Sequence, residues 1–338
     1  MALGALALVG GASAQEAGFD PEADFEAFWS LFDERYALFG VKGVDWDAAY
    51  EVFRPHVTPD TTRAELFAVF EAATELLGDV HVTVRDERGD RFARSGGRSI
   101  GVGDFDVGTF SLPLIKTAYV EDELTVRAGG TMRYGTLPGG VGYLHVGAFK
   151  YPTTSEAAAD EVAAAFADAP AVIVDVRQNG GGSDAIARTL TARFADERRL
   201  VMTAEAHEPG EAARGEPVPW HVEPEGPRQM TMPVFVLVND RTISAAENFA
   251  LMMRQLPHVT IVGQTTAGAM ADTYPVTVGD GWTFGVPSNV LRDADGRSWE
   301  GIGVVPDLWA ANTAEQVGAG RDYALEIALG FARAAAAR

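Results

Sequence analysis

Residues 172–190, VIVDVRQNGGGSDAIARTL, run from an apolar stretch through a glycine turn into a helical pattern. The apolar stretch at 172–174 is uninterrupted, as expected for a strand that is buried on both faces of a parallel sheet. After the turn, Ile186, Leu190 and Phe194 recur at the spacing of one helical face. The N–H groups of such a turn point outward at the positive end of a helix dipole. The segment therefore predicts an α/β fold with a turn suited to negative charge.

Two kinds of anion fit a turn of this type. A phosphate-binding loop places Gly-Lys-Ser/Thr after the turn, whereas Gly182 is followed by Ser183 and Asp184, whose acid repels a nucleotide. The dinucleotide pattern G-x-G-x-x-G is also absent from this turn. The second candidate is the transient oxyanion of an acyl-transfer reaction. We favour this second interpretation, which requires a nucleophile nearby.

A second junction of strand and helix, VLVNDRTISAAENF, places Ser244 where an apolar strand ends. One interpretation of Ser244 is helix capping, because Ser244 and Glu247 are spaced as an S-x-x-E capping box. The other is a nucleophile, since two such junctions in one sheet bring a serine hydroxyl close to a glycine turn. The N–H groups of Gly181 or Gly182 and of Ala245 are then the candidate donors of an oxyanion hole.

A serine nucleophile needs a base to accept its proton. The lysines of the chain all precede Ser244, and none follows it. Of the six histidines, His81 has the most suggestive position, on the polar side of an alternating segment directly after a helix stop. A histidine in such a place is also compatible with a purely structural role.

Composition excludes several classes of function. The formal net charge of -21 repels nucleic acids and anionic membranes, so neither is an expected partner. The chain has no cysteine, which excludes disulfides, thiolate zinc sites and a cysteine nucleophile.

Five regions follow one another along the chain. Strands alternating with helices from residue 138 onward predict an α/β domain with a partly parallel sheet. The regions are a signal peptide at 1–14, a helical cap at 20–85 that ends in the His81 segment, a linking region of short strands and loops at 86–137, the catalytic α/β core at 138–320 and a C-terminal helix at 321–338. Within the core, residues 203–229 are rich in Pro, Glu and Gly and predict an inserted loop, either the rim of a site or a solvated excursion.

The first residues resemble an export signal. A short apolar run ends in Ala12-Ser13-Ala14, the small-x-small pattern of a signal-peptidase site before Gln15. The run is too short to anchor the chain in a bilayer. It lacks a charged n-region, and the alternative is a disordered tail. We expect export to a periplasm or medium without a membrane anchor.

Five segments together resemble the C-terminal-processing (tail-specific) and tricorn-type serine peptidases. They are LLGDVHVTV, VIVDVRQNGGG, NDRTISAAENFA, VGQTTAGA and WEGIGVVPD, which occur in the family's order between residues 70 and 307. The lysine of the C-terminal-processing branch would fall on Ala269, so its serine-lysine dyad cannot form. The resemblance therefore points to the tricorn-like branch, in which His81 is the base and Glu300 supports it. The serine that relays between these groups in tricorn protease is replaced by Val80, which leaves Asp79 as an alternative partner of His81.

The resemblance implies a crotonase/ClpP-like fold, a twisted mixed sheet wrapped by helices and preceded by the small helical cap. It implies hydrolysis of peptide or protein substrates through an acyl-enzyme, with no metal and no organic cofactor. Residues 88–137 are too short and wrongly patterned for the PDZ domain that many members insert. Two other functions stay open: an apolar-ligand-binding protein on the same scaffold, and a crotonase-like enzyme of acyl thioesters, for which the chain shows no basic patch to hold a coenzyme. The sequence leaves the oligomeric state open.

Overall fold

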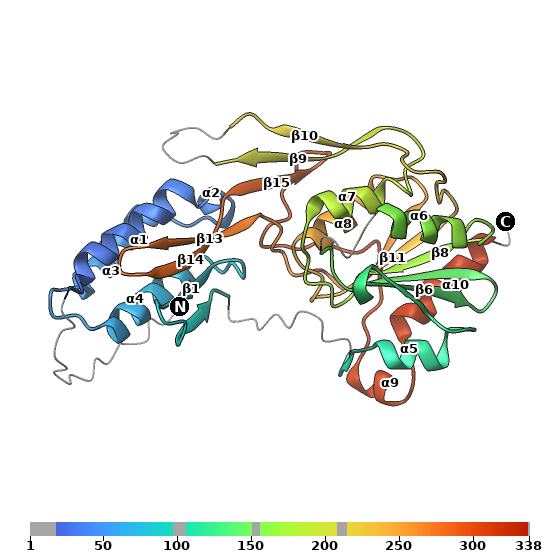
Figure 1. Ribbon diagram of the computed structural model, residues 1–338, viewed down its shortest axis with the longest axis horizontal. Coiled ribbons are helices and arrows are strands. Elements are labelled where there is room, and N and C mark those ends of the chain that lie inside the picture. The colour runs from blue at the N-terminus through green and yellow to red at the C-terminus, as the bar shows by residue number, and fades with distance from the viewer. Residues whose placement is uncertain (1–17, 97–105, 151–155, 208–214, 337–338) are drawn as a thin grey trace.

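The computed structural model describes residues 18–96, 106–150, 156–207 and 215–336. Two groups of elements lie at opposite ends of the molecule (Figure 1). The N-terminal helices and a small sheet form one end, and a large sheet flanked by helices forms the other (Figure 1). The predicted signal peptide at 1–14 lies outside the described residues. No helix in the described part of the chain is long and apolar enough to cross a membrane.

The predicted N-terminal helices form and are capped by polar side chains. They are α1 Pro21–Arg35, α2 Phe39–Lys42, α3 Trp46–Phe53 and α4 Arg63–Glu75. Asp20, Asp45 and Thr62 each accept a hydrogen bond from a main-chain N–H in the first turn of a helix, which fixes where α1, α3 and α4 begin. Aromatic rings fill the space between the helices; the indole rings of Trp29 and Trp46, for example, stack with centroids 4.0 Å apart.

A four-stranded sheet joins these helices to a distant part of the chain. Its order is β13-β14-β1-β2, with bounds β1 Thr83–Arg85, β2 Phe92–Arg94, β13 Thr273–Val278 and β14 Trp282–Pro287. The indole N–H of Trp282 donates to the Asp24 carboxylate of α1 at 2.7 Å. The cap is therefore more than a helical unit, because residues 273–287 complete it with two strands.

The described residues form a seven-stranded mixed sheet of order β16-β12-β11-β8-β7-β6-β5. The strands are β5 Thr125–Arg127, β6 Met132–Leu137, β7 Val141–Val146, β8 Val172–Asp175, β11 Val234–Val238, β12 Val259–Gly263 and β16 Leu308–Trp309. The five strands from β7 to β16 pair in parallel, while β6 and β5 pair antiparallel. The strand–helix alternation predicts a core from residue 138, but the antiparallel strands β5 and β6 extend the sheet back to Thr125.

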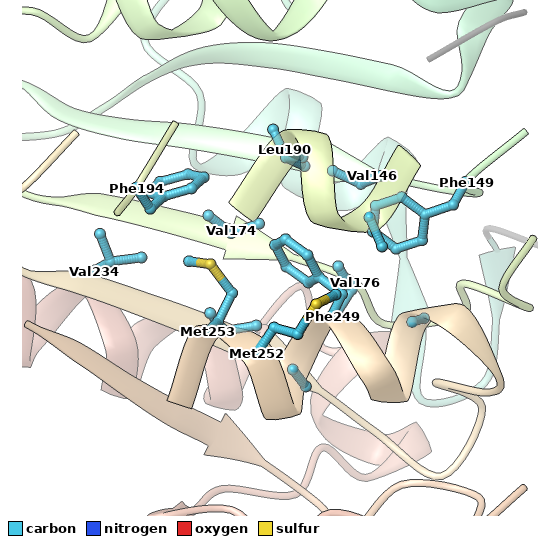
Figure 2. Close-up of a cluster of buried hydrophobic side chains, with 14 of the residues drawn as sticks. Val146, Phe149, Val174, Val176, Leu190, Phe194, Val234, Phe249, Met252 and Met253 are labelled. Atoms are coloured by element: carbon cyan, nitrogen blue, oxygen red, sulfur yellow. The ribbon is translucent and has the colours of Figure 1, made fainter. Parts of the chain in front are cut away.

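Helices cover both faces of the large sheet, as predicted for a mixed sheet wrapped by helices. On one face lie α6 Glu156–Ala165, α7 Asp184–Thr191 and α8 Ala245–Arg254. Figure 2 shows Phe249 and Met253 of α8 packed against Val174 of β8 and Leu190 of α7. On the other face lie α5 Leu112–Ala118 and α10 Tyr323–Ala336, packed against alternate strand residues such as Ile173. The short elements β3 Asp106–Val107, β4 Phe110–Ser111 and α9 Ala314–Gly318 lie near α5 (Figure 1).

The interpretation of residues 203–229 as a loop without regular structure is wrong. The structure places β9 Arg199–Ala206 and β10 Val218–Val222 there, and both join β15 Asn289–Asp293 in a three-stranded antiparallel sheet of order β10-β9-β15. This sheet runs between the two ends of the molecule (Figure 1). The pairing of β9 with β15 joins residues far apart in sequence, so local composition does not reveal it.

Candidate active site

Ser244 occupies a strained position between strand β11 and helix α8. Its φ and ψ are 62° and -132°, a backbone conformation that residues other than glycine rarely adopt. Such strain is kept where the surrounding structure enforces it, and it gathers at functional sites. The N–H of Ser244 donates to the carbonyl of Ala269 at 2.9 Å and to the Glu247 carboxylate at 3.2 Å. These two hydrogen bonds of its main-chain N–H, one to a carbonyl and one to a carboxylate, hold the serine in place.

The glycine turn after β8 lies directly against this serine. A Cβ added to Gly181, whose φ is +90°, would lie 2.6 Å from the Ser244 Cβ and 3.1 Å from the Ala245 nitrogen. The N–H of Gly181 already donates to the Asn179 side chain at 2.9 Å. By contrast, the N–H groups of Gly182 and Ala245 donate to no other group in the described part of the chain.

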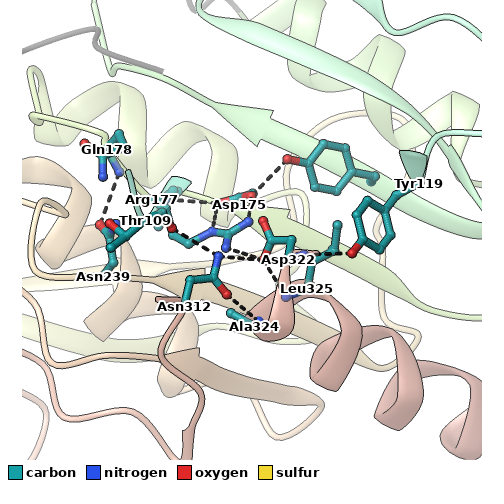
Figure 3. A network of polar contacts seen from close by, with 12 residues as sticks. Thr109, Tyr119, Asp175, Arg177, Gln178, Asn239, Asn312, Asp322, Ala324 and Leu325 are labelled. Atoms are coloured by element: carbon teal, nitrogen blue, oxygen red, sulfur yellow. Dashed lines mark hydrogen bonds and ion pairs between the residues drawn. The ribbon is translucent and has the colours of Figure 1, made fainter. Parts of the chain in front are cut away.

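A buried charge network fixes the strand end that leads into the turn (Figure 3). The Arg177 guanidinium donates to both oxygens of Asp175, at 2.9 and 2.7 Å, and to Asp322 at 2.8 Å. Tyr143 donates to Asp175 at 2.9 Å, and Asn312 donates to Asp322 at 3.0 Å. Because the Arg177 guanidinium pairs with both carboxylates, the network is a structural anchor for the turn and the start of α10.

Glu247 of α8 holds the loop on the other side of Ser244. Its carboxylate accepts hydrogen bonds from the Thr266 hydroxyl and from the N–H groups of Gly268 at 2.7 Å and Ala269 at 2.8 Å. Burial raises the pKa of this carboxyl, and the hydrogen bonds oppose that rise. The capping interaction of Glu247 with the Ser244 N–H therefore forms, and the same carboxylate also shapes the 266–269 loop.

His81 lies in a turn before β1. The main-chain N–H of His81 donates to the Asp79 carboxylate at 2.9 Å, and the N–H of Val82 donates to the Asp79 carbonyl at 2.9 Å. Val80 packs against Ile243 and Ala269, which brings this turn to the residues beside Ser244. The Nδ1 atom of His81 is buried and has no hydrogen-bond partner among the described residues, and no hydrogen bond joins its ring to the Ser244 hydroxyl there.

The electrostatics of His81 come from burial and from four charged groups. Burial lowers its pKa, the negative charges of Asp79 and Asp272 raise it, and the positive charges of Arg94 and Lys42 lower it further. The lowered pKa keeps the ring neutral and able to accept a proton at neutral pH.

Glu300 is held at this site by contacts other than one with His81. One oxygen accepts from the N–H groups of Met270 at 2.8 Å and Ala271 at 3.2 Å, and the other lies 3.8 Å from the Lys42 ammonium group. Burial, followed by the negative charge of Asp79, raises its pKa to about 8. The alternative partner, Asp79, accepts from the Tyr36 hydroxyl at 3.0 Å and from the His81 N–H. Asp79 thus shapes the turn that carries His81.

Sequence reasoning missed Asp272 as a residue of this site. The Thr273 hydroxyl donates to the His81 carbonyl at 3.4 Å, which places Asp272 beside the His81 turn. Burial raises the pKa of Asp272, and the positive charge that His81 carries when it is protonated lowers it. Asn289 donates to the Asp272 carboxylate at 2.8 Å and thereby orients it. An acid directly before the alternating segment that becomes β13 is the one signal in the sequence that could have pointed to it.

The structure brings the predicted site residues into one region. Gly181 meets Ser244 and Ala245 at the two junctions, and Gly182 is the next residue of the same turn. The His81 turn and Glu300 both contact the loop at 269–271. Among the described residues, no group of three or more His, Cys, Asp or Glu side chains is arranged to hold a metal ion.

Comparisons with known proteins identify the family of the chain. Residues 140–309 match peptidase family S41, and residues 20–74 match the tricorn protease C1 domain. The chain belongs to peptidase family S41. It is 28% identical over 171 residues to the carboxy-terminal processing protease CtpA of Bacillus subtilis, which is 49% of this chain and 35% of that protein. It is 31% identical over 100 residues to the tail-specific protease of Haemophilus influenzae, 30% of this chain and 13% of that protein. The chain thus spans about a third or less of the length of these curated relatives.

Solved structures match over almost the whole chain. A candidate peptidase from Parabacteroides merdae superposes with a TM-score of 0.81 at 28% identity, covering 93% of this chain and 97% of that one. Mature CPAF complexed with lactacystin superposes with a TM-score of 0.69 at 13% identity, covering 91% of this chain and 96% of that one. At that identity the second similarity shows the fold alone.

Proposed function

We propose that the protein is a serine peptidase that hydrolyses peptide bonds through an acyl-enzyme on Ser244. The observation that carries the proposal is the strained Ser244, set directly against Gly181 of the glycine turn, while the N–H groups of Ala245 and of Gly182, the next residue of the turn, are not otherwise engaged among the described residues. Membership of peptidase family S41 supports peptidase activity of this serine type.

In the proposed reaction, the Ser244 hydroxyl attacks the scissile carbonyl and its proton passes to the neutral His81 ring. The carbonyl oxygen becomes an oxyanion, which accepts hydrogen bonds from the N–H groups of Ala245 and Gly182. His81 then returns the proton to the leaving amine, and a water molecule hydrolyses the acyl-enzyme by the same steps. The N–H of Gly181 is bonded to Asn179 and is not a donor to the oxyanion in this reaction. Gly181 contributes instead by lacking a side chain, which lets the turn lie against Ser244.

We infer that Glu300 supports His81 through the main chain. Its carboxylate holds the N–H groups of Met270 and Ala271, and the next residue is Asp272, whose charge acts on His81. The negative charges of Asp272 and Asp79 stabilise the imidazolium that forms when His81 takes the serine proton. In this arrangement Glu300 fixes the loop, and the two aspartates provide the charge.

The test is hydrolysis of an unfolded protein, such as casein, by purified wild-type protein and by Ser244→Ala. By analogy with other serine peptidases, the substitution should lower turnover by on the order of a millionfold while the circular dichroism spectrum stays unchanged. Ser288→Ala is the matched control and should keep full activity. Equal hydrolysis by Ser244→Ala would contradict the assignment, and a wild-type protein that binds apolar ligands without hydrolysing casein would favour the binding-protein alternative.

We also propose that the protein is exported, on the strength of the Ala12-Ser13-Ala14 pattern. N-terminal sequencing of protein taken from its native compartment should find Gln15 as the first residue. Protein that keeps Met1 in the cytoplasm would contradict this proposal.

A further inference from the structure

Lys42 is the last residue of α2 in the N-terminal helices, yet its ammonium group reaches the candidate active site. Its side chain is 9% exposed and lies 3.8 Å from the Glu300 carboxylate, which is 3% exposed. The path of the side chain crosses Gly301, where an added Cβ would lie 3.4 Å from the ammonium nitrogen. A lysine is rarely buried to this extent without a partner, and here the partner is an acid of the site.

The same stretch of the N-terminal helices makes a second contact with the site. Tyr36 directly follows α1, and its hydroxyl donates to the Asp79 carboxylate at 3.0 Å. Residues 36–42 therefore contact both acids that the sequence offers as partners of His81, Asp79 through Tyr36 and Glu300 through Lys42. This connection between the cap and the active site is invisible in the sequence motifs, all of which lie after residue 70.

We propose that Lys42 is a positioning residue of the peptidase site, which favours the ionised form of the Glu300 carboxyl, holds this group in place and thereby fixes the loop that seats Ser244. The inference rests on the proposed peptidase function. It gives the N-terminal helices a part in the reaction beyond packing.

The contacts that connect Lys42 to Ser244 form a short series. Glu300 accepts from the N–H groups of Met270 and Ala271, and the carbonyl of the preceding residue, Ala269, accepts from the Ser244 N–H at 2.9 Å. A hydrogen bond to an ionised carboxylate is roughly twice as strong as one between neutral groups. Loss of the Glu300 charge would therefore loosen the loop on which the strained serine depends.

The groups that face Glu300 predict how its ionisation responds to Lys42. Burial raises the pKa of Glu300, and the negative charges of Asp79 from the His81 turn and Glu247 from α8 raise it further. The positive charge of Lys42 lowers it. The Tyr36 hydroxyl also faces this carboxyl. With these effects together the pKa is about 8. Removing the positive charge raises the pKa further, so less Glu300 is ionised at neutral pH. A rise of about one unit reduces the ionised fraction at pH 7 by about tenfold.

The experiment measures the rate at which a fluorophosphonate labels Ser244, from about pH 5 to about pH 10. The variants are Lys42→Met, Lys42→Arg, Glu300→Gln and the double variant of Lys42→Met with Glu300→Gln. Lys116→Met, which removes an exposed lysine of α5, is the matched control. Melting temperatures of all variants are recorded so that any loss of folded protein is visible.

We expect the wild-type labelling rate to show an upper inflection near the Glu300 pKa of about 8. Lys42→Met should move this inflection upward by about one unit and lower the rate at pH 7 about tenfold. Lys42→Arg should restore the wild-type profile, because it keeps the charge. In Glu300→Gln the inflection near pH 8 should be absent. Adding Lys42→Met should then move only the lower inflection, that of His81, upward, because Lys42 lowers the pKa of His81.

Two results would overturn the inference. One is an unchanged pH profile in Lys42→Met. The other is an equal loss of rate from Lys42→Met in the wild-type and Glu300→Gln backgrounds, because it would show that Lys42 acts on packing alone. If wild-type Ser244 is not labelled at any pH, the proposed peptidase function itself fails, which is a different outcome from the failure of Lys42.

Discussion

Gly181→Ala is the substitution whose effect the structure predicts most directly. The added methyl group would lie 2.6 Å from the Ser244 Cβ, 2.8 Å from the Ile243 carbonyl oxygen and 3.1 Å from the Ala245 nitrogen. Two of these neighbours are main-chain atoms of the nucleophile segment, so rotation of a side chain cannot relieve the contact. Because ordinary contact begins near 3.4 Å, the turn and Ser244 must separate by about 0.8 Å.

The magnitude follows from two separate effects. The φ of +90° at Gly181 is unfavourable for alanine and costs about 1 to 2 kcal/mol of stability. The displacement adds a loss of activity, because a misplacement of about 1 Å in an active site can lower the rate by on the order of a hundredfold. We therefore expect a modest drop in melting temperature together with a hundredfold loss of kcat.

Gly320→Ala separates the two effects. Its φ is +79° and nothing lies within 4 Å of an added Cβ, so it carries similar backbone strain without the contact. Steady-state hydrolysis of casein and thermal unfolding of both variants give the comparison. Equal activities in Gly181→Ala and Gly320→Ala would refute the claim that the glycine turn is fitted to Ser244.

Three further predictions concern the groups around this site. Because burial lowers the pKa of His81, the pH–rate profile should show activity rising with pH already below the ordinary histidine pKa of about 6.5. A first rise near pH 9 in the same profile would point to a lysine base. Glu247→Gln places an amide where a buried carboxylate accepts several N–H groups, and should lower the free energy of unfolding by at least about 2 kcal/mol; urea titration that finds no loss would contradict this structural role. Arg177→Met leaves Asp175 and Asp322 buried without their cation and should cost about 3 to 5 kcal/mol by the same titration, and a loss under about 1 kcal/mol would contradict an anchoring network.

Local patterns predicted the parts of the fold that depend on neighbouring residues. The strand, glycine turn and helix at 172–190 are confirmed as β8 and α7, since an apolar run, glycines and helical spacing all act within a few residues. The strand and helix around Ser244 are confirmed for the same reason.

Long-range pairing decided the parts that sequence reasoning missed. Strands β9 and β10 lie in a segment rich in Pro, Glu and Gly, and they form because β15 lies alongside β9. The alternation around His81 predicts a strand, whereas β1 starts at Thr83 and the Asp79 carboxylate holds His81 in a turn. A side chain that bonds to its own turn competes locally with the strand pattern.

The charged groups around Glu300 were the hardest part of the site to predict. The sequence places Glu300 in a motif, but its contacts with Lys42 and with the N–H groups of Met270 and Ala271 depend on three segments meeting in space. Lys42 lies far before Ser244 in the sequence, and this separation does not reveal that the two residues belong to the same site in the fold.

Mapping the fluorophosphonate adduct by mass spectrometry of the digested protein is the most direct test of the central claim, that Ser244 is an activated nucleophile. The folded wild-type protein should carry the adduct on the peptide that contains Ser244 and on no other serine, and heat-unfolded protein should carry none. An adduct on another residue, or folded protein that stays unlabelled across the pH range in which His81 is neutral, would contradict the claim.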